Sequence, residues 1–413
     1  MSEWQTVKLI DVCVDNGVQT GPFGSQLHQK DYVEIGTPII TVEHLGDNRI
    51  TMQNLPRVSH EDKERLSKYS LQEGDIVFSR VGSVDRRAYV RKEQEGWLFS
   101  GRCLRVRPNT QKIDPYYLSA YFGLPSFKEY VRSIAVGATM PSLNTTLLEN
   151  VPIILPPKKQ QELISHAAKS IEDKIELNQR MNETLEAMAR ALFKSWFVDF
   201  DPVRTKTEGR KPEGMDTATA SLFPSTFKDE GLPEGWHLGQ LDDLLVLQRG
   251  FDLPNAKRIP GKYAVMAASG LNGTHNEYMV SGPGVTTGRS GVLGNVFFIH
   301  EDFWPLNTSL WIKEFKGSTP AHAFYLLQGL DFAAFNAGSA VPTLNRNHVH
   351  SIPVPVPPKA LVAKFDEIVM PWLMLQRHNE LETQTLSSLR DALLPKLISG
   401  ELRFDDGKGK HVK

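Results

Sequence analysis

The chain has 413 residues, of which 40% are hydrophobic and 23% charged, and its formal net charge is -1. This length predicts two or three domains, and no apolar run approaches the ~20 residues that a membrane-spanning helix needs. Two cysteines, Cys13 and Cys103, exclude a disulfide framework and a cysteine-rich zinc site. The first residues, Met1-Ser-Glu-Trp-Gln5, lack the basic segment and apolar core of a secretory signal. We therefore expect the protein in the cytoplasm.

Residues 1–157 and 236–358 are predicted to form two domains of the same kind. Short apolar runs in them are typical of strands: Pro38–Val42, Asp75–Ser79 and Gly294–Ile299. Few helical segments lie between these runs. The predicted fold class is α+β, with two pseudo-repeated mixed α/β domains separated by two long helices.

Sequence motifs recur along the chain at an offset of 201 residues. Gly137-Ala-Thr-Met-Pro-Ser-Leu-Asn144 resembles Gly338-Ser-Ala-Val-Pro-Thr-Leu-Asn345, and Val151–Pro157 resembles Ile352–Pro358. The offset then continues without a gap into the segments that follow, whereas upstream the match is looser. The chain is therefore predicted to hold one domain and one helix twice over, with the domains diverged and the helices preserved. Two different ligand sequences would produce such divergence.

A double proline follows each domain, and after it a seven-residue apolar repeat predicts a helix, over 158–198 and over 359–396. The repeat positions are Ile164, Ile171, Asn178, Leu185 and Leu192 in the first helix, and Phe365, Trp372, Asn379, Leu386 and Leu393 in the second. A second position of each repeat, three residues later, is also predicted to face the partner helix; it is occupied by Ala167, Met181, Met188, Ile368, Leu375 and Leu389. The matched Asn178 and Asn379 predict an antiparallel coiled coil, because a polar seam residue costs stability but fixes the register. Two helices packed on their own domains are the alternative.

Two further segments complete the predicted organisation. Residues 199–235 are rich in Pro, Gly, Ser, Thr and charge and are predicted to be a linker. Residues 397–413 are predicted to be a C-terminal tail.

No motif for catalysis or for cofactor binding is found. Asp114-Pro-Tyr-Tyr117 is the string nearest to an amino-methyltransferase loop, but it lacks the second proline, and its counterpart Thr319-Pro320 favours a helix start. Gly261-Lys262 is followed by Tyr263, so it is not a phosphate-binding loop. Glu172-Asp-Lys174 lies on a predicted helix, where a solvated charged face is expected. We predict no catalytic residue, no metal site and no cofactor.

The motifs, in their order, resemble those of specificity subunits of type I restriction-modification enzymes over nearly the whole chain. They are Gly21-Pro-Phe-Gly-Ser25, Gly74-Asp-Ile-Val-Phe-Ser-Arg80, Gly137–Asn144, Ala191-Leu-Phe-Lys-Ser-Trp-Phe-Val-Asp-Phe200 and Leu393-Leu-Pro-Lys-Leu-Ile-Ser-Gly-Glu-Leu402. In the second domain, Gln248-Arg-Gly-Phe-Asp252 stands in for the first motif and Gly288-Arg-Ser-Gly291 for the Ser-Arg-x-Gly string.

The resemblance implies a non-catalytic subunit that binds double-stranded DNA. Its helices would bind two adenine methyltransferase subunits, and restriction subunits carrying the translocase and nuclease would join them. The methyl donor and ATP would belong to those partners. Each domain would read one half of a bipartite target.

Basic residues gather in both domains. Between Arg80 and Arg107 eight basic residues stand against three acidic ones, and between Gln248 and Asn295 the count is five against two. Arginine contacts phosphates and also reads guanine. The candidate DNA-binding residues are therefore Arg80, Arg86, Arg87 and Arg91 in the first domain, and Arg249, Arg258 and Arg289 in the second. An ordinary surface arginine is the alternative for each.

Two other functions stay open. The chain could be a coiled-coil scaffold for a protein or glycan ligand, in which case DNA binding would lack a steep salt dependence. It could also be a divergent stand-alone DNA-modifying enzyme, which would transfer methyl groups or cut DNA by itself. The recognised bases depend on side-chain geometry, which the sequence does not show.

Overall fold

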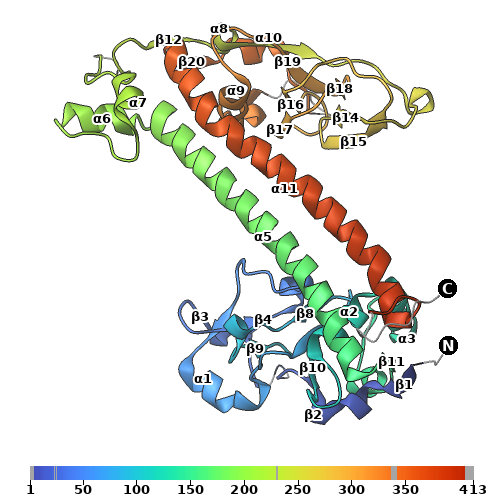
Figure 1. The fold of residues 1–413 in the computed structure, drawn as a ribbon. Helices are drawn as coiled ribbons and strands as arrows, with labels where there is room; N and C mark the ends of the chain where they lie inside the picture. The colour runs from blue at the N-terminus through green and yellow to red at the C-terminus, as the bar shows by residue number, and fades with distance from the viewer. Residues whose placement is uncertain (1–3, 23, 25, 229–230, 336–341, 405–413) are drawn as a thin grey trace. The chain divides into compact units, whose positions relative to one another are not determined.

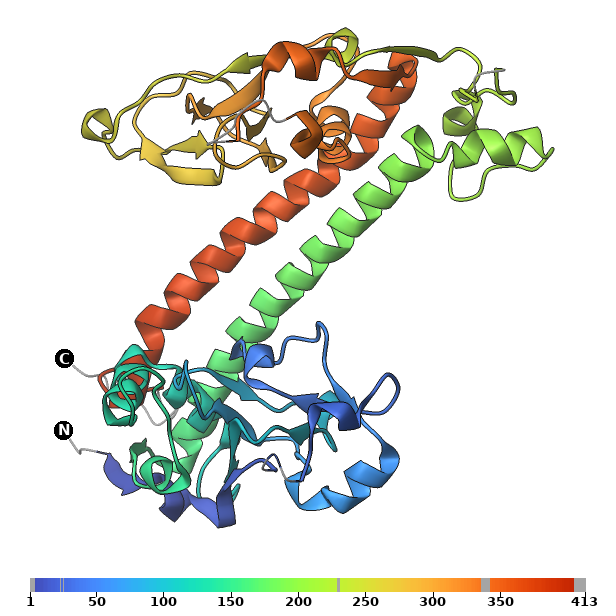
Figure 2. The ribbon, with the colours of Figure 1, turned by 180° about the vertical axis from the view of Figure 1, so that it is seen from behind.

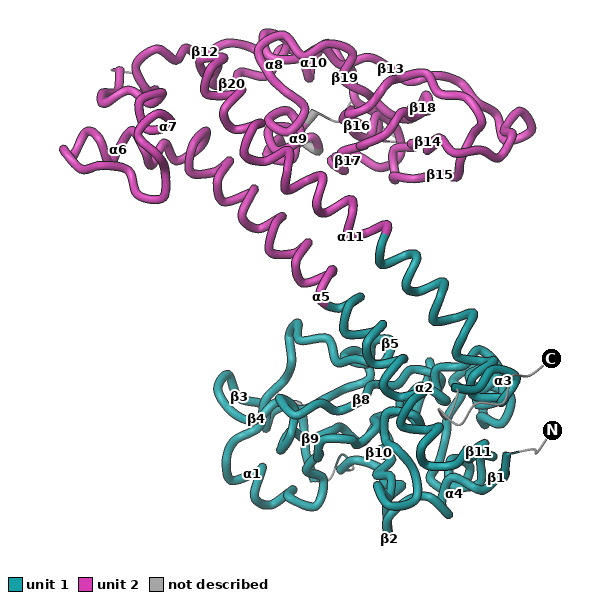
Figure 3. Tube along the Cα trace, viewed as in Figure 1, with its two compact units in different colours: residues 1–176, 382–413 teal, residues 177–381 magenta. Residues whose placement is uncertain are grey.

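The computed structural model describes residues 4–22, 24, 26–228, 231–335 and 342–404, so positions 338–341 of the repeated motif lie outside it. The chain divides into two compact units, Met1–Glu176 with Glu382–Lys413, and Leu177–Leu381 (Figure 3). Both boundaries fall inside long helices, α5 (Lys158–Phe197) and α11 (Lys359–Ser399). Each unit therefore holds one mixed domain and part of both helices. None of the described helices has a stretch apolar enough to span a membrane.

A five-stranded sheet forms the centre of the first unit (Figure 1). Its strands, in spatial order, are β2 (Cys13–Thr20), β10 (Cys103–Pro108), β7 (Ile76–Ser79), β8 (Arg87–Tyr89) and β5 (Asp47–Asn48). Successive side chains of a strand point to opposite faces, so Ile76 and Phe78 enter one core while Val77 enters another. All three are fully buried. A strand covered on both faces needs a continuous apolar run, which is what the sequence has here.

The remaining elements of the first unit cover the two faces of this sheet. One core is closed by helices α2 (Pro115–Gly123), α3 (Pro125–Ile134) and α4 (Thr145–Glu149). The other core is closed by a sheet of β3 (Tyr32–Val33), β6 (Arg57–Val58), β4 (Thr37–Ile40) and β9 (Leu98–Phe99). The other elements are β1 (Gln5–Lys8) paired with β11 (Pro152–Leu155), α1 (His60–Arg65), and 3-10 helices at Leu9–Val12, Gln29–Asp31, Val42–His44, Ser67–Tyr69 and Lys92–Gln94.

The second unit contains two larger sheets of similar strand order, each with one strand fewer than its counterpart in the first unit. Its four-stranded sheet is β13 (Leu245–Arg249), β19 (Ser309–Phe315), β16 (Gly284–Gly288) and β17 (Val296–Ile299). Its three-stranded sheet is β15 (Gly270–His275), β14 (Tyr263–Ala267) and β18 (Phe303–Pro305), and β12 (His237–Gln240) pairs with β20 (Pro353–Val356). Its helices are α8 (Leu241–Leu244), α9 (Pro320–Gln328), α10 (Arg346–His350), and 3-10 helices at Asn255–Lys257 and Phe332–Phe335. Both units thus have the expected mixed α/β content.

The segment 199–235 is not an extended linker. It contains α6 (Asp201–Thr207) and α7 (Thr217–Ser221), and its Phe200, Val203 and Phe223 lie in the main core of the second unit. The segment was predicted to be a linker because turn-forming residues dominate its composition, and its few buried apolar residues did not stand out among them. The C-terminal tail also packs in part, because Leu397 and Ile398 are buried in the core of the first unit.

Within the second unit, α5 and α11 contact each other in opposite directions (Figure 2). Asn178 and Asn379 are buried at this contact, with 0% and 2% of their surface exposed. The Asn379 Nδ2 donates to Asn182 Oδ1 at 2.8 Å, and the Asn178 Nδ2 to the Asn379 carbonyl at 3.5 Å. Asn182 also exchanges side-chain to backbone bonds with Gln376, at 3.1 and 3.0 Å. The two asparagines therefore lie at a matched position of the helix contact, where Asn182 and the Asn379 backbone accept their side-chain amides.

The second buried position of each seven-residue repeat was predicted one residue too early. Met188, Leu375 and Leu389 are 46%, 40% and 45% exposed. The buried positions lie four residues after a repeat residue rather than three: Ala168, Ile175, Ala189 and Trp196 in α5, and Val369 and Leu397 in α11. Within a seven-residue repeat, the second buried residue can lie either three or four positions after the first. Apolar residues occur at both positions here, so the sequence did not distinguish them.

Candidate nucleic-acid interface

Loops of the first domain meet beside the ends of β7 and β10. We call residues 21–22, 80–86, 100–102 and 136–143 the first loop cluster. Two backbone hydrogen bonds join them, Gly82 N to Pro141 O (2.9 Å) and Leu143 N to Arg80 O (2.9 Å), and a third ties Gly21 N to the carbonyl of Cys103 at the start of β10 (3.2 Å). A Cβ at Gly21 would lie 2.2 Å from the Ser100 carbonyl oxygen, so only glycine permits this approach. Three of the sequence motifs are thereby brought to one place.

The second domain has a matching arrangement. Residues 249–252, 288–295, 306–308 and 342–346 form the second loop cluster. The corresponding bonds are Gly291 N to Pro342 O (2.9 Å), Leu344 N to Arg289 O (2.8 Å) and Gly250 N to Ser309 O (3.1 Å). A Cβ at Gly250 would lie 2.3 Å from the Leu306 carbonyl oxygen. The strings Gln248–Asp252 and Gly288–Gly291 therefore occupy the places of the first-domain motifs.

Arg80 and Arg289 hold their own loop clusters together. The Arg80 amide donates to the Arg102 carbonyl at 2.8 Å and its Nη1 to the Gly101 carbonyl at 3.2 Å. The Arg289 amide donates to the Thr308 carbonyl at 2.8 Å and its Nη1 to the Asn307 carbonyl at 3.2 Å. Both side chains are half-buried. Each arginine thus joins two loops, whatever else its guanidinium contacts.

Arg86 and Arg87 are neighbours in the chain but face opposite ways. Arg86 is exposed, and its side chain has no hydrogen bond or ion pair among the described residues. Arg87 is 4% exposed; its Nε donates to the Ser119 carbonyl at 2.9 Å and its Nη1 lies 3.1 Å from Asp47. A guanidinium in this place cannot reach DNA, so the prediction for Arg87 is corrected.

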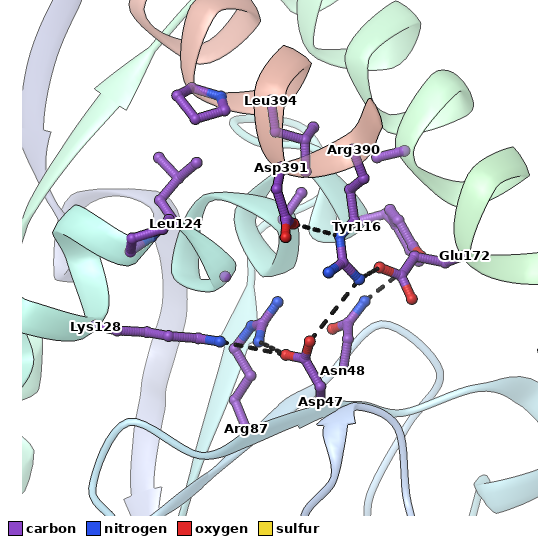
Figure 4. Close-up of a pocket in the computed structure, with 15 residues that line it drawn as sticks. Asp47, Asn48, Arg87, Tyr116, Leu124, Lys128, Glu172, Arg390, Asp391 and Leu394 are labelled. Carbon is purple, nitrogen blue, oxygen red and sulfur yellow. Dashed lines mark hydrogen bonds and ion pairs between the residues drawn. The ribbon is translucent and has the colours of Figure 1, made fainter. Parts of the chain in front are cut away.

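Arg87 belongs to a charged network around a cavity of about 200 Å³ in the first unit (Figure 4). Asp47 lies 3.1 Å from Arg87, 3.4 Å from Lys128 and 3.8 Å from Arg390 of α11, and Arg390 lies 2.5 Å from Glu172 of α5. Burial lowers the pKa of Arg87 below its usual value, although Asp47 opposes this shift. Burial by itself would raise the pKa of Asp47, but the three cations outweigh it and the pKa is lowered. The network ties the end of α11 to the first domain.

The other predicted arginines differ in how far their side chains are engaged in bonds within the protein. Arg91 lies 2.5 Å from Glu176 and 3.8 Å from Asp173, and thereby joins the segment that follows β8 to α5. Arg258 donates to the backbone and side chain of Asn272 at 2.8 and 2.6 Å. The Arg249 side chain is 51% exposed and lies 3.3 Å from Asp252. Of these three, Arg249 is the one placed at a loop cluster.

Two arginines at the loop clusters were not among the candidates. Arg102 is exposed on the β9–β10 turn, and Arg346 is exposed at the start of α10. Arg346, Arg249 and Arg289 line one hollow of about 500 Å³ in the second unit. Arg102 lay within the basic stretch, but its closeness to Arg80 comes from strand pairing that no local pattern showed. No group of three or more His, Cys, Asp or Glu residues in the described chain is placed to hold a metal ion.

Comparison with known proteins gives consistent matches. The family model "Type I restriction modification DNA specificity domain" matches residues 1–187 and 233–362. The type I restriction enzyme MjaIX specificity subunit of Methanocaldococcus jannaschii is 24% identical over 317 residues, covering 70% of this chain and 69% of that protein. The HindI specificity subunit of Haemophilus influenzae is 24% identical over 409 residues, covering 81% and 88%. The crystal structure of a type I restriction-modification S subunit from M. genitalium aligns with a TM-score of 0.67 at 16% identity over 95% of this chain and 96% of that chain, a likeness of fold.

Proposed function

Because the chain belongs to the family of type I restriction-modification specificity subunits, we propose that its two domains are copies of one DNA-reading module. Proteins of this family recognise DNA and are non-catalytic. In the proposal, residues 1–157 read one half of a bipartite target and residues 236–358 read the other. We propose the cytoplasm as the location of this protein, as expected from its sequence.

The pair of loop clusters is the observation that carries this proposal. Both clusters are held by corresponding backbone bonds, and both contain an arginine that bonds to a neighbouring loop. The exposed side chains on them differ: Arg86 stands where the second domain has Asn295, since Ser79 N bonds to Arg86 O as Gly288 N bonds to Asn295 O. One backbone arrangement with two sets of exposed side chains is what two different half-sites require.

The candidate DNA contacts follow from exposure and place. We propose Arg86 in the first loop cluster, and Arg249 and Arg346 in the second, because these side chains are exposed there. Arg80 and Arg289 are half-buried and hold the loops that carry these contacts. Basic side chains at such loops neutralise phosphates, so binding should weaken steeply with added salt. Arg91 is paired with Glu176 of α5 and Arg258 is bonded to Asn272, so both are assigned to the scaffold.

We also propose that α5 and α11 form an antiparallel coiled coil that docks two adenine methyltransferase subunits, to which restriction and translocase subunits attach. Large apolar side chains are exposed on both helices: Leu177 (53%), Met188 (46%), Met374 (58%) and Leu381 (43%). Such side chains mark interaction surfaces when they gather on one element. Binding sites for the methyl donor and for ATP belong, in this proposal, to the partner subunits.

The lengths of α5 and α11 are expected to set the spacer between the two half-sites. Inserting seven residues after Asn178 and seven after Asn379 adds about 10 Å at 1.5 Å per residue, which equals roughly three base pairs at ~3.4 Å each. The helices turn by only ~20° over a heptad, whereas three base pairs turn the groove by about 100°. The DNA must twist to compensate. We expect a longer preferred spacer, unchanged half-sites and reduced affinity.

Selection of bound sites from a DNA library with randomised spacer length measures this effect. A seven-residue insertion in α5 alone is the control, because the two helices then differ in length and can no longer align from end to end, which should abolish spacer preference. An unchanged spacer at full affinity in the double insertion would show that another feature sets the distance.

Methylation-sensitive sequencing tests the proposed function as a whole. A cell that expresses this chain with its methyltransferase subunits should carry methylated adenines in one bipartite motif with a fixed spacer. Deleting the chain should abolish that methylation. Methylation that persists at the same motif without the chain would exclude a role in specificity.

A further inference from the structure

The two loop clusters can be compared position by position, because their backbone bonds correspond. Arg80 N bonds to Arg102 O as Arg289 N bonds to Thr308 O, and Arg80 Nη1 bonds to Gly101 O as Arg289 Nη1 bonds to Asn307 O. The turn itself closes alike in both domains, by Cys103 N to Ser100 O and by Ser309 N to Leu306 O, each at 2.9 Å. Arg102 therefore holds the place of Thr308, and Gly101 that of Asn307.

Arg80 and Arg102 have opposite roles within the first loop cluster. The Arg80 guanidinium is half-buried and bonded to the turn, and its counterpart Arg289 has the same bond. Arg102 is exposed, and its guanidinium makes no hydrogen bond or ion pair within the described parts of the chain. An arginine present in both domains, such as Arg80 and Arg289, can support a structure common to both. Arg102, which is matched by Thr308 in the second domain, can instead account for a difference between the two half-sites.

The backbone of Arg102 is well fixed although its side chain is free. Its carbonyl accepts the Arg80 amide, the neighbouring Gly101 carbonyl accepts the Arg80 side chain, and Gly21 approaches the same turn so closely that a Cβ there would overlap the Ser100 carbonyl. A side chain on a rigid backbone loses less conformational entropy when it binds a base, so such a support favours base recognition. In the second domain Thr308 is turned inward, with its Oγ1 accepting from the Ala268 amide at 3.4 Å.

We propose that Arg102 is a specificity-determining residue of the first domain, which reads a base edge in the first half-site with guanine as its preferred partner. This rests on the proposed DNA-reading function and names the side chain that carries part of it. Arginine presents two parallel donors to the N7 and O6 acceptors of guanine in the major groove, whereas threonine cannot. Arg80 and Arg289 are positioning residues that hold the two reading turns.

The test uses the chain in complex with its methyltransferase subunits and a DNA library randomised in both half-sites. Arg102→Ala should lower the preference for guanine at one base pair of one half-site by about fivefold or more, and leave the other half-site unchanged. Arg102→Lys keeps the charge but loses the planar two-donor fork, so it should weaken the same preference while the slope of affinity against salt stays as in the wild type. Arg65→Ala, on α1, removes an exposed arginine outside the cluster and should change no preference.

The outcomes separate this inference from the function on which it rests. If the wild-type complex selects a bipartite site but Arg102→Ala selects the same bases with the same strength, Arg102 is not a reading residue. If Arg102→Ala weakens all sequences alike and lowers the salt slope by about one while Arg102→Lys restores both, Arg102 contacts a phosphate and the inference is wrong. A wild-type complex with no bipartite preference contradicts the proposed function itself, and this inference with it.

Discussion

Exchange of residues 1–157 for the corresponding domain of a relative with a different target is expected to change one half of the recognised sequence completely and to leave the other half as it is. The reason is that each loop cluster is built from its own domain, by bonds such as Leu143 N to Arg80 O in the first and Leu344 N to Arg289 O in the second. Sequencing of methylated sites in cells that carry the hybrid chain measures both halves at once.

The exchange must respect the contact of the first domain with α11. The donor domain should carry an acidic residue in the place of Asp47 and an arginine in that of Arg87, because Arg390 depends on this network. The reciprocal exchange of residues 236–358 is the matched control and should alter only the opposite half-site. If either hybrid changes both halves, the two domains do not read independently and the modular proposal fails.

Replacement of Arg87 by alanine is expected to destabilise the first unit by about 3 kcal/mol. The change leaves the Ser119 carbonyl without its charged donor, which costs ~1–3 kcal/mol, and empties space beside Gly123, which adds a cavity term. Asp47 keeps Lys128 and Arg390 as partners and is half-exposed, so its own penalty is small. Hydrogen exchange, followed peptide by peptide, should show faster opening of β7 and β10 and no change in the second unit.

Arg86→Ala is the matched control, because it removes an arginine one position away that is exposed on the surface. Its effect on stability should stay within about 0.5 kcal/mol. Equal stability of the Arg86 and Arg87 variants would show that Arg87 is not part of the core, and a DNA contact by Arg87 would have to be considered again.

Acid should reduce the difference between wild type and Arg87→Ala. The pKa of Asp47 is lowered in the folded protein, so its ion pairs stabilise the fold above the unfolded pKa of about 3.9. This contribution is lost as the pH falls through the lower, folded pKa. Denaturation at a series of pH values should therefore show the two proteins approaching each other below about pH 4, and a gap that widens there would contradict this assignment.

The sequence by itself determined the long helices and the family. The apolar seven-residue repeats follow the double prolines, and α5 and α11 begin at Lys158 and Lys359, directly after them. Such patterns are local: a periodicity of seven and a proline stop act on neighbouring residues, so they can be read without the fold. The motifs that indicated the family could also be identified from the sequence, because they occur in a fixed order along the chain.

The tertiary structure decided which arginines face solvent. Arg86 and Arg87 stand in one basic stretch and look alike in the sequence, yet one is exposed and the other is buried against Asp47 and Ser119, which come from distant parts of the chain. Successive residues entering a strand point to opposite faces, and which face is covered depends on elements packed from elsewhere. Arg102 was passed over for the same reason. Its support by Arg80 and Gly21 arises from the pairing of β2, β7 and β10, and pairing between segments so far apart leaves no signal in the residues around any one of them.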